Sequence, residues 1–427
     1  MLRLITAVAA LLSASSISAE SYAIQAGHLI VDAAKPERGP STVIVDNGRI
    51  VRIDDGITAP AGATVVDLRS KTVMPGMTDV HVHLTSTAGQ PWYQSLTPKY
   101  SEAYATTTGL RNALVMARAG FTTVRDLGSG PESGIAVRDA IREGGFPGPR
   151  VMVSGPALSM IGGHGDEAVG LNPELAGAVS ARGQIGVCTG VDECSRAVRR
   201  IAATGVDVIK FHATGGVLDP GAMGLEQHFS DEEMKAIVTT AHSLGLKTAA
   251  HAHGARGILA AVRAGVDSIE HGTFADAAGL KIMKANGSYM VPTLMAFTGI
   301  RERLGKNIYT PTVEAKVRET LKSVGLALKA ARDMGVPIAF GTDSGVFEHG
   351  RNAQEFAQMV ELGGLTPAQA IATATTGAAK LLGLENEVGR IAIGYSADMI
   401  GVTGDPVANV RILEKVGFVM VRGRVIE

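Results

Sequence analysis

The sequence has few cysteines, almost no net charge and no apolar run long enough to cross a membrane. Its 427 residues carry a formal charge of -1, and the basic residues are scattered. Nucleic acid and anionic membrane surfaces attract proteins through clustered basic residues. The composition therefore excludes such partners and favours a small-molecule partner.

The two cysteines, Cys188 and Cys194, offer too few ligands for a zinc site of their own. In an oxidising compartment they could form a disulfide bond, and two free buried thiols are the alternative. A catalytic role for either cysteine is not favoured.

The first residues, "MLRLITAVAALLSASSISAE", place Arg3 before an apolar run that ends in small residues. This pattern is typical of a signal peptide and is too short for a spanning helix. We expect a signal peptide at residues 1–19, cleaved near Ser18 or Ala19. The mature protein is then expected to be soluble, in the periplasm or secreted.

One sequence pattern recurs between residues 105 and 343. It consists of an amphipathic helical stretch, a glycine and a short apolar run. Each glycine suits a left-handed helix end, and each run suits a buried parallel strand. The glycines are Gly120, Gly205, Gly245, Gly265, Gly287 and Gly335. With the strands "MTDVHVHL" and "RVMVSG", the sequence contains eight strand–helix units. It therefore predicts an α/β fold with a (β/α)8 TIM-type barrel at residues 74–387, rather than a doubly wound open sheet.

The two ends of the chain have a different pattern. "STVIVDNGRIVRI" and "FVMVRGRVI" each contain a turn dipeptide between alternating strands, Asn47-Gly48 and Arg422-Gly423. We expect residues 20–73 and 388–427 to form a small β-sandwich domain, into which the barrel is inserted.

Polar residues cluster where the predicted barrel strands end, which is where barrel enzymes have their active sites. They are His81, His83, His164, Lys210, His251, His253, His271 and Asp343. His81 and His83 are two residues apart in a strand, so both point into the barrel, and Asp79 shares that face. Imidazoles combined with a carboxylate favour a divalent metal site, with zinc as the first choice and manganese, cobalt and iron as alternatives.

Lys210 lies at the end of a buried strand, where an ammonium group is costly. Its simplest interpretation is a lysine that reaches the barrel mouth or pairs with an acid. We prefer a neutral amine that reacts with carbon dioxide, because the resulting carbamate is an anion that can bridge two metal ions.

The motifs "HVHL", "IKF", "HAHG", "IEHGT" and "FGTDS" resemble the metal-ligand signatures of the amidohydrolase superfamily. Nearly the whole mature chain shares the resemblance. The pattern is similar to the imidazolonepropionase-like group, which contains Xaa-Pro dipeptidases (prolidases), carboxypeptidase-like enzymes and ochratoxin-hydrolysing amidohydrolases.

The resemblance implies a ligand set and a mechanism. His81, His83 and Asp343 would hold one ion, His251 and His271 the other, with N6-carboxylated Lys210 as the bridge. A metal-activated hydroxide would attack an amide carbonyl, with Asp343 as the base. The resemblance places His253 and His164 at the substrate, as donors to the oxyanion or to a substrate carboxylate.

The predicted activity is therefore hydrolysis of dipeptides or N-acyl amino acids with a free carboxylate, including aryl amides such as ochratoxin A. Alternatives are a cyclic amide, lactone or organophosphate hydrolase on the same centre, or a non-catalytic barrel. The last is disfavoured because all six ligand positions are filled. Similar proteins often form homo-oligomers, and we expect the same here.

The remaining features receive simpler interpretations. His28 and His242 are expected to be surface or packing residues, and Glu270 is expected to face the helical layer because it alternates with His271. His212, His228 and His349 lie close to predicted strand ends. The loop around Trp92 is interpreted as a substrate lid.

Overall fold

The computed structural model describes residues 21–89, 101–181, 184–220 and 224–427. The expected signal peptide and Trp92 lie outside the described residues. Among the described residues, no helix combines the length and the apolar character needed to span a membrane.

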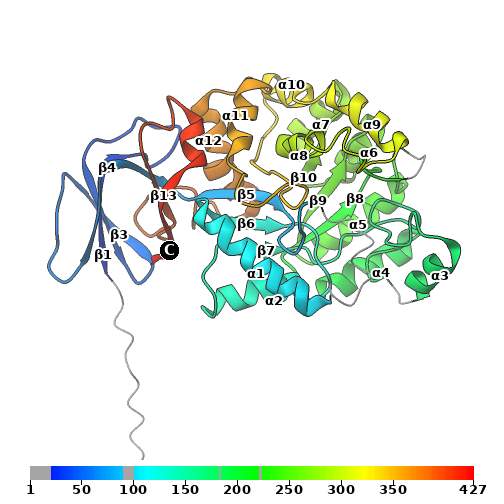
Figure 1. The fold of residues 1–427 in the computed structure, drawn as a ribbon, viewed down its shortest axis with the longest axis horizontal. Helices are drawn as coiled ribbons and strands as arrows, with labels where there is room; N and C mark the ends of the chain where they lie inside the picture. The colour runs from blue at the N-terminus through cyan, green and yellow to red at the C-terminus, as the bar shows by residue number, and fades with distance from the viewer. Residues whose placement is uncertain (1–20, 90–100, 182–183, 221–223) are drawn as a thin grey trace, which may run out of the picture.

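In the described part of the chain, seven parallel strands form the centre of the larger part of the molecule, and the helices lie around their outside (Figure 1). They make a three-stranded sheet, β5-β6-β7, and a four-stranded sheet, β8-β9-β10-β11. The strands are β5 (Met77–Val82), β6 (Phe121–Asp126), β7 (Arg150–Val153), β8 (Val208–His212), β9 (Lys247–Ala252), β10 (Ser268–His271) and β11 (Tyr289–Val291).

Isolated parallel bridges join these two sheets into a ring. Leu158 pairs with Phe211 between β7 and β8, Met290 pairs with Ile338 after β11, and Ser344 pairs with Val82 of β5. The α/β class is confirmed, and the order of the pairs is the one that the predicted barrel requires.

The eighth predicted strand is not a regular strand. Its segment makes isolated hydrogen bonds, in which Met290 donates to the Pro337 carbonyl and Val80 donates to the Phe340 carbonyl. Proline has no N–H to donate to a ladder. Asp343 has a φ of 61°, which turns the chain out of the extended conformation.

Thirteen α-helices occur in the described residues, and most follow the predicted pattern. They are α1 (Glu102–Arg118), α2 (Ser133–Arg142), α3 (Pro173–Ala181), α4 (Val191–Ala202), α5 (Asp231–Ser243), α6 (Ala255–Ala264), α7 (Ala277–Asn286), α8 (Leu294–Arg301), α9 (Pro311–Leu321), α10 (Leu326–Met334), α11 (Gln354–Glu361), α12 (Pro367–Ala372) and α13 (Ala378–Leu382). All six predicted helix-end glycines have positive φ angles, between 72° and 94°. The left-handed conformation carries no Cβ penalty in glycine, so each helix can end and pass directly into a buried strand.

The two ends of the chain meet in one seven-stranded sheet, at the left of Figure 1. Its order is β14-β13-β12-β4-β1-β2-β3 within the described residues. The strands are β1 (Tyr22–Leu29), β2 (Ser41–Asp46), β3 (Arg49–Asp55), β4 (Thr64–Pro75), β12 (Met399–Val402), β13 (Val416–Val421) and β14 (Arg424–Val425). Both predicted hairpins are present, and all four turn residues have positive φ angles. The structure shows one hydrogen-bonded sheet, and the two-layer sandwich is not confirmed.

Cys188 and Cys194 form a disulfide bond with their Cα atoms 5.1 Å apart. Cys194 lies in α4, and the Cys188 N–H donates to the Ser159 carbonyl at 3.0 Å. The bond therefore fixes the segment before α4 next to the loop that carries His164.

We predict that the unreduced protein, once denatured, contains no thiol that reacts with an alkylating reagent. A protein in which both cysteines are changed to serine should lose about 2 kcal/mol of unfolding free energy, because the short loop is no longer closed in the unfolded chain. Denaturant titration measures that loss. Two reactive thiols in the unreduced wild-type protein would contradict the bond.

Candidate metal centre

The structure brings the predicted ligand residues together at the carboxyl ends of the strands. Two groups have ligand atoms that all lie within 4.8 Å of one another. The first group is His81, His83 and Asp343, and the second is His251, His253 and His271. All are buried except His83, which is partly exposed.

In the first group, the outer nitrogen of each ring is bound by an oxygen that only accepts hydrogen bonds. His81 Nδ1 lies 2.9 Å from Glu270 Oε2, and His83 Nδ1 lies 3.2 Å from the Gly128 carbonyl. Each Nδ1 therefore carries the hydrogen in the neutral ring, and each Nε2 keeps a lone pair. Both Nε2 atoms face Asp343 Oδ1, at 3.5 Å for His81 and 3.1 Å for His83.

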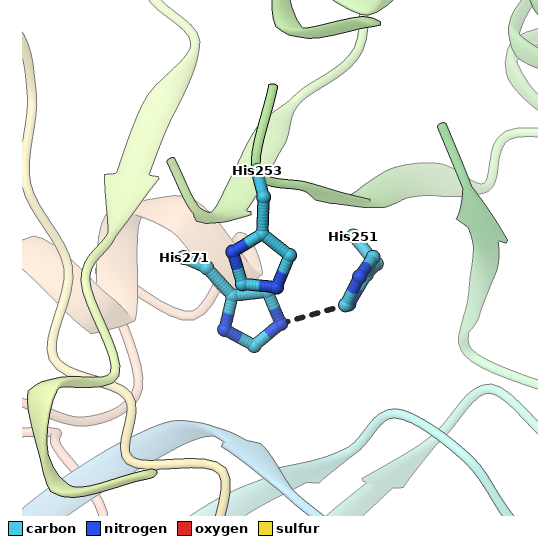
Figure 2. A group of neighbouring side chains, drawn as sticks. All are labelled: His251, His253 and His271. Carbon is cyan, nitrogen blue, oxygen red and sulfur yellow. Dashed lines mark hydrogen bonds between the residues drawn. The ribbon is translucent and has the colours of Figure 1, made fainter. Parts of the chain in front are cut away.

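In the second group the outer nitrogens also have hydrogen-bond partners, one a carbonyl and the other a hydroxyl. His251 Nε2 lies 3.4 Å from the Gly215 carbonyl, and His271 Nδ1 lies 2.6 Å from Thr293 Oγ1. His251 Nδ1 and His271 Nε2 lie 2.9 Å apart and share a hydrogen bond (Figure 2).

A metal ion can take the place of a hydrogen shared by two imidazole nitrogens, because each nitrogen then offers a lone pair. Neutral imidazoles with outer hydrogen-bond partners and a carboxylate are the donors that zinc and similar ions take from proteins. The donor set therefore fits a divalent metal in each group.

Lys210 lies beside these donors and is buried. Its Nζ atom is 3.5 Å from His81 Nε2. Burial lowers the pKa of Lys210 to about 8, although Glu270 and Asp343 oppose this shift. A fixed ammonium group would repel a cation at this place.

The expectation for Glu270 is wrong. It faces the centre, where its carboxylate accepts hydrogen bonds from His81 Nδ1, from Arg125 Nη2 at 2.9 Å and from Ser268 Oγ at 2.5 Å. His271 has a φ of 70°, which breaks the alternation on which the expectation rested. Burial would raise the pKa of Glu270, but Arg125 and His81 lower it to about 2.

Sequence reasoning also missed Arg125, which is 1% exposed inside β6. Its Nε atom donates to the Val80 carbonyl at 2.6 Å. Its guanidinium group pairs with Glu270 and compensates the buried negative charge. An arginine within the fully buried strand "FTTVRD" needs an acidic partner, and Glu270 is that partner.

Asp79 acts on the main chain rather than on a ligand ring. It accepts hydrogen bonds from the N–H groups of His81 and Thr342, and from the side chains of Thr342 and Asn352. Burial raises the pKa of Asp79 to about 7. This carboxyl group ties β5 to the segment that carries Asp343.

Of the two expected substrate residues, His253 belongs to the second group and His164 lies beside it. The His164 ring stacks on His251 with a centroid distance of 4.3 Å, and His164 Nδ1 is 2.5 Å from Asp219 Oδ1. Asp219 is held in turn by the Gly216 N–H at 2.7 Å. A Cβ atom on Gly216 would lie 2.3 Å from the His164 ring, so only glycine allows this packing.

The other histidines are divided between the centre and the surface. His212 contacts the rings of His164 and His251, and His228 Nδ1 accepts the His164 N–H at 3.4 Å. His28 and His242 are exposed, as expected.

Comparison with known proteins shows which family the chain belongs to. Residues 72–426 match the amidohydrolase family. The chain is 32% identical to the ochratoxinase of Aspergillus niger over 427 residues, which covers 95% of this chain and 86% of that protein.

Solved structures are similar as well. A Xaa-Pro dipeptidase with methionine bound in its active site has a TM-score of 0.87 and 35% identity, over 95% of this chain and 99% of that one. A prolidase complexed with N-methylphosphonate-L-proline has a TM-score of 0.85 and 30% identity, over 95% and 99% of the two chains. These matches confirm the resemblance predicted from the motifs: the chain belongs to the amidohydrolase family and is a hydrolase.

Proposed function

We propose that this hydrolase uses two divalent metal ions to cleave the amide bond of dipeptides or N-acyl amino acids that have a free carboxylate. The observation that carries the proposal is the convergence of ring nitrogens from four imidazoles whose outer nitrogens already have hydrogen-bond partners. Relatives named ochratoxinase, Xaa-Pro dipeptidase and prolidase support an amide substrate.

The proposed metal ligands are Lys210 and five residues of the two groups. His81, His83 and Asp343 would hold one ion, His251 and His271 the other, and carboxylated Lys210 would join the two. Zinc is the preferred ion for this mixture of imidazole and carboxylate. When bound, the ions would polarise the substrate carbonyl and lower the pKa of a water molecule.

The side chains then have distinct roles. Burial would raise the pKa of Asp343, but His81, His83 and Lys210 lower it, so this carboxylate stays ionised. It can take a proton from the attacking water and pass it to the leaving amine. His164, oriented by Asp219, can donate to the oxyanion or to the substrate carboxylate.

Glu270 would orient His81. Its carboxylate fixes the hydrogen on His81 Nδ1, while Arg125 keeps that carboxylate ionised. Neither residue reaches the ligand-facing side of the ring.

We also propose that the mature protein works outside the cytoplasm. The disulfide bond supports this location, because such bonds persist in oxidising compartments.

Protein produced with added zinc should contain two metal ions per chain by elemental analysis, and chelation should abolish amide hydrolysis until zinc is restored. Lys210→Ala should lose both metal and activity, because it removes the bridging anion. Lys322→Ala changes an exposed lysine and is the matched control. Full metal content and activity in Lys210→Ala would remove the bridging role.

A substrate screen should show turnover of dipeptides and N-acyl amino acids, and amidation of their free carboxylate should weaken it. The screen should include lactones, cyclic amides and organophosphates. Turnover confined to those three classes would overturn the proposed substrate and favour the alternative.

Glu270→Gln should reduce metal affinity or kcat by about 10- to 100-fold, because the amide no longer fixes the His81 hydrogen as a carboxylate does. Ser268→Ala removes a neutral partner of the same carboxylate and should have a smaller effect. Equal effects of the two changes would argue against orientation of His81 by charge.

A further inference from the structure

We propose that the disulfide bond between Cys188 and Cys194 positions His164 for the substrate, and that Ser159 transmits its effect. The inference rests on the proposed function, because that function gives His164 its role at the substrate. It goes further by giving a part in substrate turnover to a bond outside the metal centre. The cysteines and Ser159 are positioning residues, since they would act through His164 alone.

One end of the disulfide bond is anchored in the core of the molecule. Cys194 lies in α4, whose buried face also includes Ala197, Val198 and Ile201. Both cysteines are fully buried and belong to the main hydrophobic core cluster. The bond therefore ties Cys188 to a packed helix and limits its movement.

The segment that ends at Cys188 is paired with Ser159. The Ser159 N–H donates to the Gly186 carbonyl at 2.9 Å, and the Ser159 carbonyl accepts the Cys188 N–H at 3.0 Å. The preceding residue is bound to β8, because the Leu158 N–H donates to the Lys210 carbonyl at 2.8 Å. Ser159 is thus held between β8 and the segment that the disulfide bond fixes.

The side chain of Ser159 holds the backbone next to His164. Ser159 is fully buried, and its Oγ atom accepts the Gly165 N–H at 3.1 Å while donating to the Met160 carbonyl at 3.1 Å. The N–H of His164 itself has a longer contact, at 3.4 Å from His228 Nδ1. The Ser159 hydroxyl is therefore the closer support of the backbone that carries the His164 ring.

The chain between Ser159 and Gly186 includes α3, which contributes little packing of its own. Val179 is the one buried residue of this helix, and Leu175 is 52% exposed. A segment with few buried apolar contacts opens locally at a low cost in free energy. Without the disulfide bond, we expect the segment before Cys188 to open more often, which would break its hydrogen bonds to Ser159.

The ring of His164 has little freedom to adjust to such a change. Its centroid lies 4.3 Å from that of His251 and 4.8 Å from that of His212. A Cβ atom on Gly165 would lie 2.5 Å from the His212 ring, so the backbone beside His164 is closely packed as well. A shift of this backbone therefore moves the ring, and a misplacement of about 1 Å can cost about 100-fold in rate.

The test is a double-mutant cycle in the full mature chain, assayed with N-acetyl-L-methionine or with the best substrate of the screen. The bond is removed by Cys188→Ser with Cys194→Ser, in the wild type and in His164→Asn. Its removal should lower kcat/KM by about 10- to 100-fold in the wild type and by less than about 2-fold in His164→Asn. The loss of unfolding free energy should be the same in both backgrounds, because it arises from the unfolded chain.

Asn286→Ala is the matched control for loss of stability. The Asn286 amide donates to the Val262 carbonyl at 2.8 Å, and this residue precedes β11, at the opposite end of the strands from the centre. The control should be less stable and should keep its kcat/KM. Ser159→Ala removes the acceptor of the Gly165 N–H, and it should lower kcat/KM in the wild type but not in His164→Asn.

A second measurement does not require a known substrate. Hydrogen exchange followed by mass spectrometry should be faster in peptides that contain residues 159–165 when the bond is absent, and unchanged in peptides that contain β10. Unchanged exchange at residues 159–165 would overturn the inference, whatever the substrate is. Equal losses of kcat/KM in the two backgrounds would overturn it as well.

The proposed function fails separately. A wild-type protein that hydrolyses no amide, but turns over another class of the screen, would contradict that function, and the cycle is then measured with the other class. If the protein without the bond does not fold, Ser159→Ala with and without His164→Asn provides the same cycle. Equal effects of Ser159→Ala in the two backgrounds, or no effect in either, would overturn the inference.

Discussion

The site depends on one constraint, which is that buried imidazoles must present lone pairs to a common point. A neutral ring does so only when its other nitrogen carries the hydrogen and gives it to a fixed acceptor. The outer nitrogens are bound by Glu270, by the carbonyls of Gly128 and Gly215, and by the Thr293 hydroxyl. Three of the four come from the loops that follow the strands, so loop conformation sets the chemistry of the rings.

The site contains buried charged groups, whose burial is unfavourable. Ion pairs and hydrogen bonds compensate for this burial. Glu270 is fully buried, but Arg125 pairs with it inside the barrel-like ring of strands. Removing one partner of such a pair leaves an uncompensated charge, which is strongly destabilising. Asp79 has no cationic partner of this kind. Burial raises its pKa to about 7, although hydrogen bonds from neutral donors lower it.

Much of the fold could be predicted from local pattern. The six helix-end glycines are local signals, and all have the positive φ angles that the sequence predicts. The irregular eighth strand and the inward position of Glu270 were not predicted. Both depend on left-handed residues, Asp343 and His271, whose conformation the apolar pattern does not reveal. A non-glycine residue with positive φ persists only where its surroundings enforce it.

The sequence by itself determined that the predicted ligand residues reach the centre, because the repeated helix–glycine–strand pattern places each strand end at the same edge of the fold. The tertiary structure alone decided that Glu270 faces the centre and that the ring of His253 packs against those of His251 and His271. The reason is distance along the chain: His81 and Glu270 are 189 residues apart, yet their hydrogen bond decides the tautomer of His81. Such a contact exists only after the strands have assembled.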